Sequence, residues 1–270
     1  MGEQLGNCMD VIKSKDNSKI KYVRSLNSRK NRDTDFVVEG IKFVKEAVNQ
    51  KAHIKFVLLN ENETVKNEFA ELIEFLKIDK IEFFYCNDNV FSSVAETINA
   101  QGILAVTAKK AYDKELILHE CKFIVMCDRI QDPGNLGTII RTADAFGPAA
   151  VILNRGCVDP YNSKVVRATA GAMFRVPFIT GDTSEEIIDY LKDSGFKIIA
   201  TVVDSDFSFE DIEESEKICI VIGNEGQGIS QTITEASDMN ITIKMSGRQE
   251  SLNASIAAGI SIYEIRKKLL

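Results

Sequence analysis

Six short apolar runs recur through the second half of the chain, and each is followed by a turn or by a helical pattern. They read CKFIVMCD, AAVILN, FRVPFIT, KIIATVV, KICIVIG and MNITIKM. The first run is apolar almost throughout, which is typical of a strand buried on both faces of a parallel sheet. The runs therefore predict a six-stranded α/β domain, a class of fold that binds ligands at the loops where its strands end.

The first half of the chain alternates shorter apolar runs with helical stretches. FVVE, HIKFVLLN, IEFFYC and GILAVTA predict four strands of a smaller α/β module. The charged stretch AKKAYDKELILHE follows them without a strong period. We therefore predict domains over residues 1–107 and 121–270, joined by a linker over residues 108–120.

Composition excludes several classes of protein. With 270 residues, 44% of them apolar and 27% charged, the chain has the make-up of a folded globular protein. It shows no apolar stretch long enough to cross a bilayer and no apolar leader, so we expect a cytoplasmic protein. Its six cysteines lack CxxC spacing and only two histidines accompany them, which favours reduced thiols over a metal site.

The net charge of −7 conceals a very uneven distribution. Residues 13–32 hold eight Lys or Arg against one Asp, whereas residues 182–216 hold twelve Asp or Glu against two Lys. A basic arm on an acidic protein concentrates positive potential where an RNA backbone could bind. The arm also fits a plain amphipathic helix, because Ile20, Val23 and Leu26 recur at helical spacing. Its candidate RNA-binding residues are Lys19, Lys21, Arg24, Arg29, Lys30 and Arg32.

Three separated segments carry the polar residues that could do chemistry, and the first follows the run CKFIVMCD. Its sequence QDPGN predicts a turn, with Asn135 as the N-cap of a helix that carries Arg141 on its second turn. An arginine near the open N–H groups of a helix start suits an anion such as phosphate. The simpler alternative is an ordinary turn with a surface arginine.

The second segment, GNEGQG, follows the run KICIVIG. Gly223, Gly226 and Gly228 surround Asn224 and Glu225, and glycines there let the main chain approach a ligand closely. The spacing matches neither the dinucleotide fingerprint nor a phosphate loop. A tight turn with Glu225 capping a helix near Ile229 explains the segment equally well.

The third segment, ESLN, precedes a helix rich in small and apolar residues. Ser251 would make a good N-cap for that helix. Its hydroxyl and the amide of Asn253 could instead orient a ligand.

Together the three segments resemble the signature motifs of the SpoU/TrmH RNA ribose 2′-O-methyltransferases of the SPOUT superfamily, over residues 122–268. Residues 19–107 resemble that family's L30e-like substrate-binding domain, through IKYVRSLNSRKNR, FVVEGIKFVKEA and QGILAV. The resemblance implies a C-terminal α/β domain with a deep trefoil knot behind a smaller α/β domain. Lys244 stands where many relatives have proline, which puts only the local strand end in doubt.

The resemblance also implies an activity, which is methyl transfer from S-adenosylmethionine to a ribose 2′-hydroxyl in RNA, with 23S rRNA favoured, by a homodimer. The implied catalytic residues are Asn135, Arg141, Glu225, Ser251 and Asn253. The implied cofactor-binding residues are Thr201, Gly223, Asn224, Gly226, Ile243, Ser251 and Leu252.

This set of residues suits the reaction, because transfer from a sulfonium needs neither a metal nor a covalent intermediate and depends largely on positioning. A guanidinium keeps its proton up to about pH 12. Arg141 would therefore either clamp the target phosphate and polarise the hydroxyl, or be strongly perturbed and remove the proton. Three other functions stay open: a tRNA methyltransferase, a catalytically silent RNA-binding relative, and a small-molecule enzyme.

Overall fold

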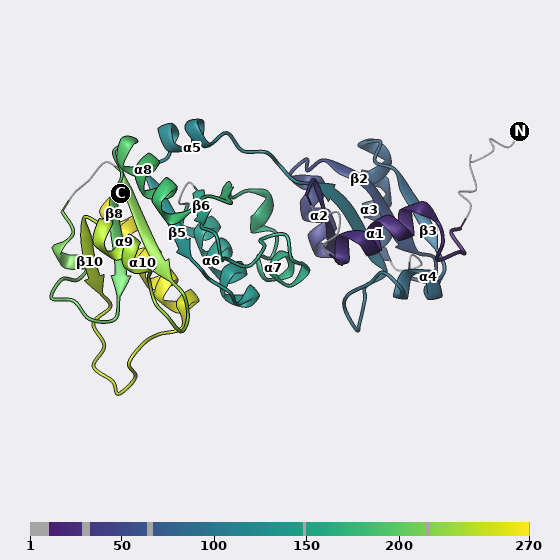
Figure 1. The fold of residues 1–270 in the computed structure, drawn as a ribbon. Coiled ribbons are helices and arrows are strands. Elements are labelled where there is room, and N and C mark those ends of the chain that lie inside the picture. The colour runs from purple at the N-terminus through teal and green to yellow at the C-terminus, as the bar shows by residue number, and fades with distance from the viewer. Residues whose placement is uncertain (1–10, 29–32, 64–66, 148–149, 214–216, 270) are drawn as a thin grey trace, which may run out of the picture. The chain divides into compact units, whose positions relative to one another are not determined.

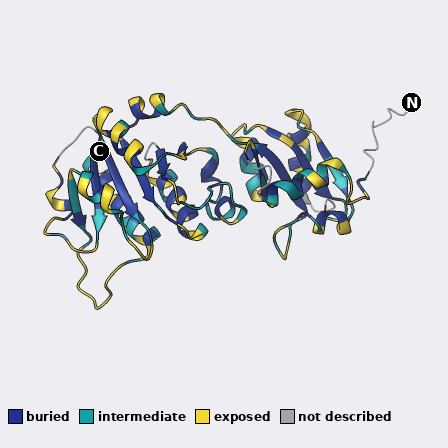
Figure 2. Cartoon of the chain, in the orientation of Figure 1, coloured by how far each residue is buried: buried dark blue, intermediate teal, exposed yellow. Residues whose placement is uncertain are grey.

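The computed structural model describes residues 11–28, 33–63, 67–147, 150–213 and 217–269. The chain divides into two compact units, residues 1–110 and residues 111–270. Each unit is built around its own sheet, and the strands of both sheets are the most deeply buried elements (Figures 1 and 2).

The first unit has a four-stranded sheet in the order β1-β4-β2-β3. Its strands are β1 (Asp35–Glu39), β2 (Ile54–Asn60), β3 (Phe83–Cys86) and β4 (Ile103–Ala108). β4 runs antiparallel to β1 and β2, whereas β2 and β3 are parallel. The helices are α1 (Ser18–Asn27), α2 (Ile41–Asn49), α3 (Asn67–Ile78) and α4 (Asp88–Ser92).

Helix α1 is the amphipathic helix that the basic arm allowed. Its apolar residues Ile20, Val23 and Leu26 are fully buried in the core of the first unit. A polar contact also holds the helix to the sheet, because Tyr22 donates a hydrogen bond to the buried carboxylate of Asp35. Lys55 donates to the same carboxylate at 2.5 Å. From Ser18 to Asn27 the arm is therefore an integral helix of the domain.

The second unit has the predicted six-stranded sheet, in the order β10-β8-β9-β5-β6-β7, with every neighbouring pair parallel. The strands are β5 (Phe123–Asp128), β6 (Ala150–Leu153), β7 (Phe178–Thr180), β8 (Lys197–Val202), β9 (Ile218–Gly223) and β10 (Met239–Thr242). The helices are α5 (Lys114–Glu120), α6 (Pro133–Phe146), α7 (Ser163–Ala168), α8 (Ser184–Asp193), α9 (Gln231–Ala236) and α10 (Ala254–Leu269). Two short 3₁₀ turns, η1 (Ala172–Phe174) and η2 (Phe209–Asp211), complete it.

The order of the strands brings the three polar segments together. β5 and β9 are neighbours at the centre of the sheet, so the segments that follow Asp128 and Gly223 leave it at the same edge. α10, which follows the third segment, packs on both β9 and α6. α6 in turn packs on α7, and the two helices approach so closely that a side chain at Gly137 would overlap Ala168. The trefoil knot stays an expectation from the resemblance.

Two stretches are more structured than their sequences indicated. The predicted linker, residues 108–120, contains α5, whose Ile117 and Leu118 join the core of the second unit. The acidic stretch after β8, read as a solvated loop, contains η2 and buries Phe209 and Ile212. In both cases a few apolar residues within a charged stretch have enough neighbours to be buried. No helix in the described part of the chain has the length and apolar character to span a membrane.

Candidate active site

Helix α6 begins three residues earlier than the sequence indicated. Its N-cap is Asp132, whose Oδ1 accepts the main-chain N–H of Asn135 at 2.8 Å, and Pro133 occupies the first helical position. The prediction that Asn135 caps this helix was therefore wrong. Asp132 lies three residues before Asn135 and is followed by Pro133, which favours the start of the helix at that point. As a consequence, the buried side-chain amide of Asn135 is available to other partners.

A chain of side-chain hydrogen bonds links the three segments. Asn253 donates from Nδ2 to Oδ1 of Asn135 at 2.9 Å, and Asn135 donates from Nδ2 to Oε1 of Glu225 at 2.9 Å. We call this chain Asn253–Asn135–Glu225 the amide relay. A carboxylate can only accept, so Glu225 sets the orientation of the Asn135 amide, which then presents its oxygen to Asn253. One residue from each segment thus takes part in a single polar array.

Asn253 also caps helix α10. Its Oδ1 accepts the main-chain N–H groups of Ser255 at 2.9 Å and Ile256 at 3.3 Å. The prediction that Ser251 is the cap was therefore wrong, because the helix begins at Ala254 and the residue next to it supplies the acceptor. With its oxygen engaged at the helix, Asn253 must turn its N–H₂ group toward Asn135.

Glu225 is exposed but well supplied with donors. Beyond Asn135, it accepts main-chain N–H groups from Gln131 at 3.4 Å and Asp132 at 3.3 Å. Burial raises the pKa of Glu225, but the hydrogen bonds from Asn135 and from these N–H groups lower it by more. The pKa of Glu225 therefore lies below its ordinary value. Glu225 does not cap the helix that follows it, since α9 begins at Gln231 with Ser230 as its cap.

Arg141 lies outside the relay. It is exposed on the third turn of α6, six residues after Asn135, or about 9 Å along the helix axis. Its guanidinium makes no hydrogen bond or ion pair with a described residue of the chain. The structure thus brings together Asn135, Glu225 and Asn253, and leaves Arg141 free at the surface of the same helix.

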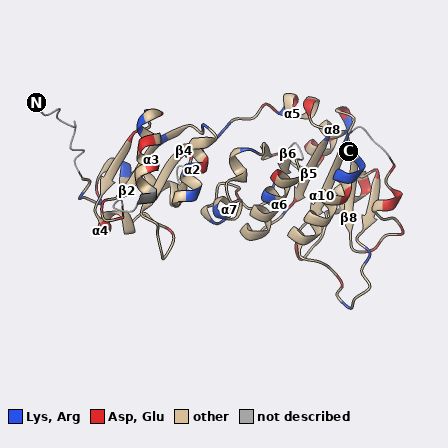
Figure 3. Cartoon of the chain, turned by 180° about the vertical axis from the view of Figure 1, so that it is seen from behind, with Lys and Arg blue, Asp and Glu red and all other residues tan. Residues whose placement is uncertain are grey.

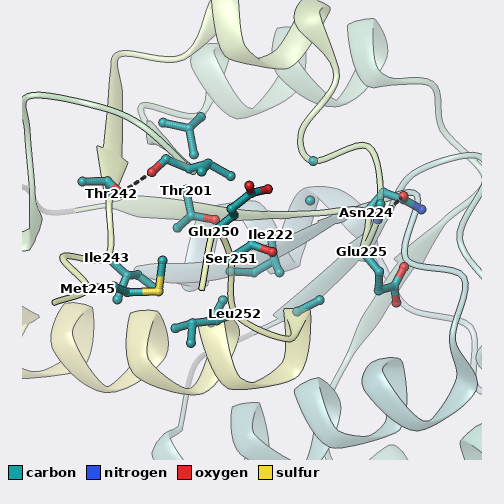
Figure 4. Close-up of a pocket in the computed structure, with 17 residues that line it drawn as sticks. Thr201, Ile222, Asn224, Glu225, Thr242, Ile243, Met245, Glu250, Ser251 and Leu252 are labelled. Carbon is teal, nitrogen blue, oxygen red and sulfur yellow. Dashed lines mark hydrogen bonds between the residues drawn. The ribbon is translucent and has the colours of Figure 1, made fainter. Parts of the chain in front are cut away.

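A pocket of about 160 Å³ opens beside the relay, between the ends of β8, β9 and β10 and the start of α10 (Figure 4). All seven candidate cofactor-binding residues line it, namely Thr201, Gly223, Asn224, Gly226, Ile243, Ser251 and Leu252. Glu225 lines it as well and so connects the pocket to the relay. Ser251 was also a catalytic candidate, and it lines this pocket rather than taking part in the relay.

The glycine-rich loop forms one wall of the pocket. Asn224 and Gly228 pair across the loop with two main-chain hydrogen bonds of 3.0 Å, and Asn224 Oδ1 accepts the N–H groups of Gly226 and Gln227 at 2.9 Å. Gly223 must be glycine at this approach, because a Cβ there would lie 2.5 Å from the main chain of Gly228 and Ile229. The loop is therefore a tight turn that also presents main-chain groups to a ligand.

Sequence reasoning missed several pocket residues. Thr242 at the end of β10, Met245, and Glu250 of the third segment also line the pocket, and Figure 4 labels all three among its lining residues. Glu250 stands next to Ser251 and Thr242 next to Ile243, so their position beside candidates was the available signal. Within the described ranges, no group of three or more His, Cys, Asp or Glu side chains is arranged to hold a metal ion.

Of the basic residues of α1, Lys19 and Arg24 contact other elements of the first unit, whereas Lys21 faces solvent. Lys19 lies 4.2 Å from the ring centre of Phe84 and 3.7 Å from the carboxylate of Glu82, and Arg24 donates to Ser93 at 2.9 Å. Lys21 is exposed and pairs only with Asp16, at 3.0 Å, among the partners described. Arg29, Lys30 and Arg32 lie outside the described residues. Figure 3 shows that acidic residues gather instead around η2 in the second unit.

The comparisons with known proteins agree with this arrangement. Residues 122–263 match the SpoU rRNA Methylase family, and residues 17–105 match the MRM3-like substrate binding domain. The chain belongs to the SpoU rRNA methylase family. The prediction of an RNA methyltransferase of the SpoU/TrmH type, with a separate N-terminal domain for its substrate, is confirmed.

Individual relatives cover almost the whole SpoU-family chain. It is 32% identical to the 23S rRNA (guanosine(2553)-2′-O)-methyltransferase RlmP of Bacillus subtilis, over 96% of this chain and 100% of that protein. A solved rRNA methyltransferase of Sinorhizobium meliloti with AdoMet bound has a TM-score of 0.84 at 29% identity, covering 97% and 98%. The SpoU methyltransferase AviRb of Streptomyces viridochromogenes, also with AdoMet, has a TM-score of 0.83 at 26% identity, covering 93% and 98%. The predicted fold class is thereby confirmed, with the knot still an expectation, and both of these solved relatives bind the cofactor that the resemblance implied.

Proposed function

We propose that this SpoU-family chain transfers a methyl group from S-adenosylmethionine to the 2′-hydroxyl of one ribose in ribosomal RNA. The amide relay carries the proposal, because it joins one polar residue from each of three distant segments beside a pocket. Similarity to rRNA methyltransferases over nearly the full chain favours rRNA over tRNA.

The pocket suits a ligand that combines an apolar ring system with a polar tail. Ile222, Ile243 and Leu252 supply an apolar wall, while the main chain of the glycine-rich loop supplies donors and acceptors. These residues, together with Thr201 and Ser251, are the ones that would hold S-adenosylmethionine. The bound sulfonium would supply an electrophilic methyl group without help from a metal.

The relay would then fix the groups around the acceptor. Glu225 is a carboxylate at neutral pH, as any glutamate with an ordinary or lowered pKa is, and it holds the Asn135 amide in one orientation. Asn253 holds the other end of that amide and ties it to the start of α10. Such fixed positioning is the main contribution a protein can make to this transfer.

Arg141 would act on the RNA. Its guanidinium is exposed and unpaired among the described residues, so it is available to form paired hydrogen bonds with a phosphate oxygen of the target nucleotide. In that place it would also polarise the 2′-hydroxyl. Removal of the hydroxyl proton by Arg141 is the alternative role, and it would require the guanidinium to lose its own proton.

We also propose that the chain works as a homodimer in the cytoplasm. Phe146 of α6 and Tyr263 of α10 are both partly exposed and meet edge to face at 5.7 Å, and Ile256 is exposed on α10. An exposed apolar face of this kind on a folded domain favours contact with another protein surface. Sedimentation of the parent chain and a Tyr263→Glu variant tests this, because the variant should shift toward a monomer.

The activity is tested with S-adenosylmethionine labelled in its methyl group. Purified chain is incubated with unmodified rRNA and, separately, with tRNA, and the label is traced to nucleosides after digestion. Label in a 2′-O-methylnucleoside from rRNA is the expected result. Label only in tRNA would move the substrate class, and RNA binding without label would indicate a silent relative.

A further inference from the structure

Arg129, the residue directly after β5, adopts a backbone conformation that non-glycine residues avoid. Its φ of 57° places it in the left-handed region. Residues are held in this region when surrounding contacts over-determine them, and such positions cluster around functional sites. The contacts of Arg129 therefore indicate what this conformation is for.

The side chain of Arg129 spans from the sheet to the glycine-rich loop. Nε and one terminal nitrogen donate to the carboxylate of Asp128 at 3.2 and 3.3 Å. The other terminal nitrogen donates to Oε1 of Gln227 at 2.9 Å, and the first also reaches the carbonyl of Gly228 at 3.2 Å. One guanidinium thus bridges the buried carboxylate of Asp128 and two residues of the glycine-rich loop.

The anchor at the other end of this guanidinium is rigid. Asp128 is fully buried and also accepts Asn154 Nδ2 at 2.5 Å and the main-chain N–H of Ser230 at 2.6 Å. Asn154 in turn accepts the N–H of Arg129 at 2.8 Å. Arg129 is therefore fixed at both its main chain and its side chain, and it neutralises a buried carboxylate.

The loop that Arg129 holds is the one that builds the site. Asn224, Glu225, Gly226 and Gly228 line the pocket, and Glu225 belongs to the amide relay. We propose that Arg129 is a positioning residue, whose guanidinium fixes the glycine-rich loop so that the pocket wall and the Glu225 carboxylate are in place before the ligand arrives. This inference rests on the proposed function for its effect on cofactor binding.

The guanidinium can be separated from the rest of the turn by substitution. The carbonyl of Arg129 accepts Asn224 Nδ2 at 2.7 Å, and any residue with the same backbone conformation would keep that bond. Arg129→Lys keeps a positive charge beside Asp128 but cannot reproduce the planar fork. Arg129→Gly removes the side chain while relieving the left-handed strain.

The test compares Arg129→Lys and Arg129→Gly with the parent and with Arg155→Ala, which removes a guanidinium from the neighbouring turn outside this contact. Calorimetry gives the Kd for S-adenosylmethionine, steady-state assays separate KM from kcat, and hydrogen exchange reports the amides of Gln227 and Gly228. We expect the Kd to rise about 2- to 10-fold for each lost hydrogen bond in both Arg129 variants, with faster exchange at those amides. Arg155→Ala should match the parent in all three readouts.

The inference is overturned if both Arg129 variants keep the parent's Kd and the parent's exchange at Gln227 and Gly228, whatever happens to their melting temperatures. A parent chain that neither binds S-adenosylmethionine nor methylates RNA would instead contradict the proposed function. In that case the exchange measurement alone still decides whether Arg129 fixes the loop.

Discussion

Asn135 lies in α6 and Asn253 caps α10, 118 residues apart in sequence, and their side-chain amides meet through a 2.9 Å hydrogen bond. Each amide has its second group engaged elsewhere, that of Asn135 at Glu225 and that of Asn253 at the first turn of α10. The contact therefore couples the geometry of the site to the placement of the C-terminal helix. Substitutions can remove one of these functions and leave the other.

Asn253→Ser separates the relay from the helix cap. Serine caps helices about as well as asparagine, so the free energy of unfolding should stay near that of the parent. The N–H₂ group that faces Asn135 is lost, and we expect methyl transfer to fall about 10- to 100-fold because the site is no longer positioned. Asn253→Ala, the comparison variant, should lose the same activity and about 1 kcal/mol of stability as well. Equal turnover in Asn253→Ser and the parent would remove the relay from the mechanism.

Glu225→Gln tests the charge at the other end of the relay. Because the folded state lowers the pKa of Glu225, its carboxylate stabilises the protein above the ordinary pKa of glutamate, and this contribution is lost as the pH falls through the folded value. The parent should therefore be more stable than the variant at neutral pH, and the difference should shrink in acid. Urea unfolding across this pH range measures the difference in the free energy of unfolding. Glu120→Gln, at another exposed glutamate, is the control. A difference that does not depend on pH would show that the carboxylate charge is not involved.

Arg141→Ala should abolish methyl transfer while leaving the Kd for S-adenosylmethionine and the melting temperature close to the parent's. The guanidinium is exposed and holds no described partner, so its removal costs the fold little. Arg141→Lys should recover only part of the activity, because lysine lacks the planar fork that pairs with phosphate. Turnover within a few-fold of the parent in Arg141→Ala would exclude this residue from the chemistry.

Lys21→Gln tests the RNA contact of α1 without disturbing the helix. Lys21 is exposed, unlike Lys19 and Arg24, whose contacts inside the first unit would confuse the result. If Lys21 neutralises one phosphate, the slope of log affinity against log salt should fall by about 0.7 to 0.9. Anisotropy titrations over a series of salt concentrations give this slope, and Lys192→Gln on α8 provides the control. Identical slopes for Lys21→Gln and the parent would mean that α1 is simply a solvated helix.

The sequence was most informative where periodicity and turn residues agreed. All six strands of the second unit were predicted, because parallel strands buried on both faces are apolar along their length. The helix caps were mispredicted at Asn135 and Ser251, since Asp132 and Asn253 are equally good capping residues only a few positions away. Local propensity could not choose among them, whereas contacts between distant segments do.

The amide relay itself could not be derived from spacing. Its residues were named through a family resemblance, and nothing local to Asn135, Glu225 or Asn253 shows that the three meet. Their meeting depends on β5 and β9 being neighbours and on α10 returning to pack on α6, which are properties of the strand order. Arg129 was not predicted as a site residue for the same reason, because its partners Gln227 and Gly228 lie almost a hundred residues away in sequence.

The measurement that tests the account most directly is a map of alkali-resistant linkages in 23S rRNA. A methyl group on a ribose 2′-oxygen protects the adjacent phosphodiester from hydrolysis, so the map reports the acceptor atom as well as the nucleotide. Unmodified rRNA incubated with the parent chain and S-adenosylmethionine should gain one protected linkage, and rRNA incubated with Arg141→Ala should gain none. A map with no new protected linkage, or methyl label found on a base, would contradict the account.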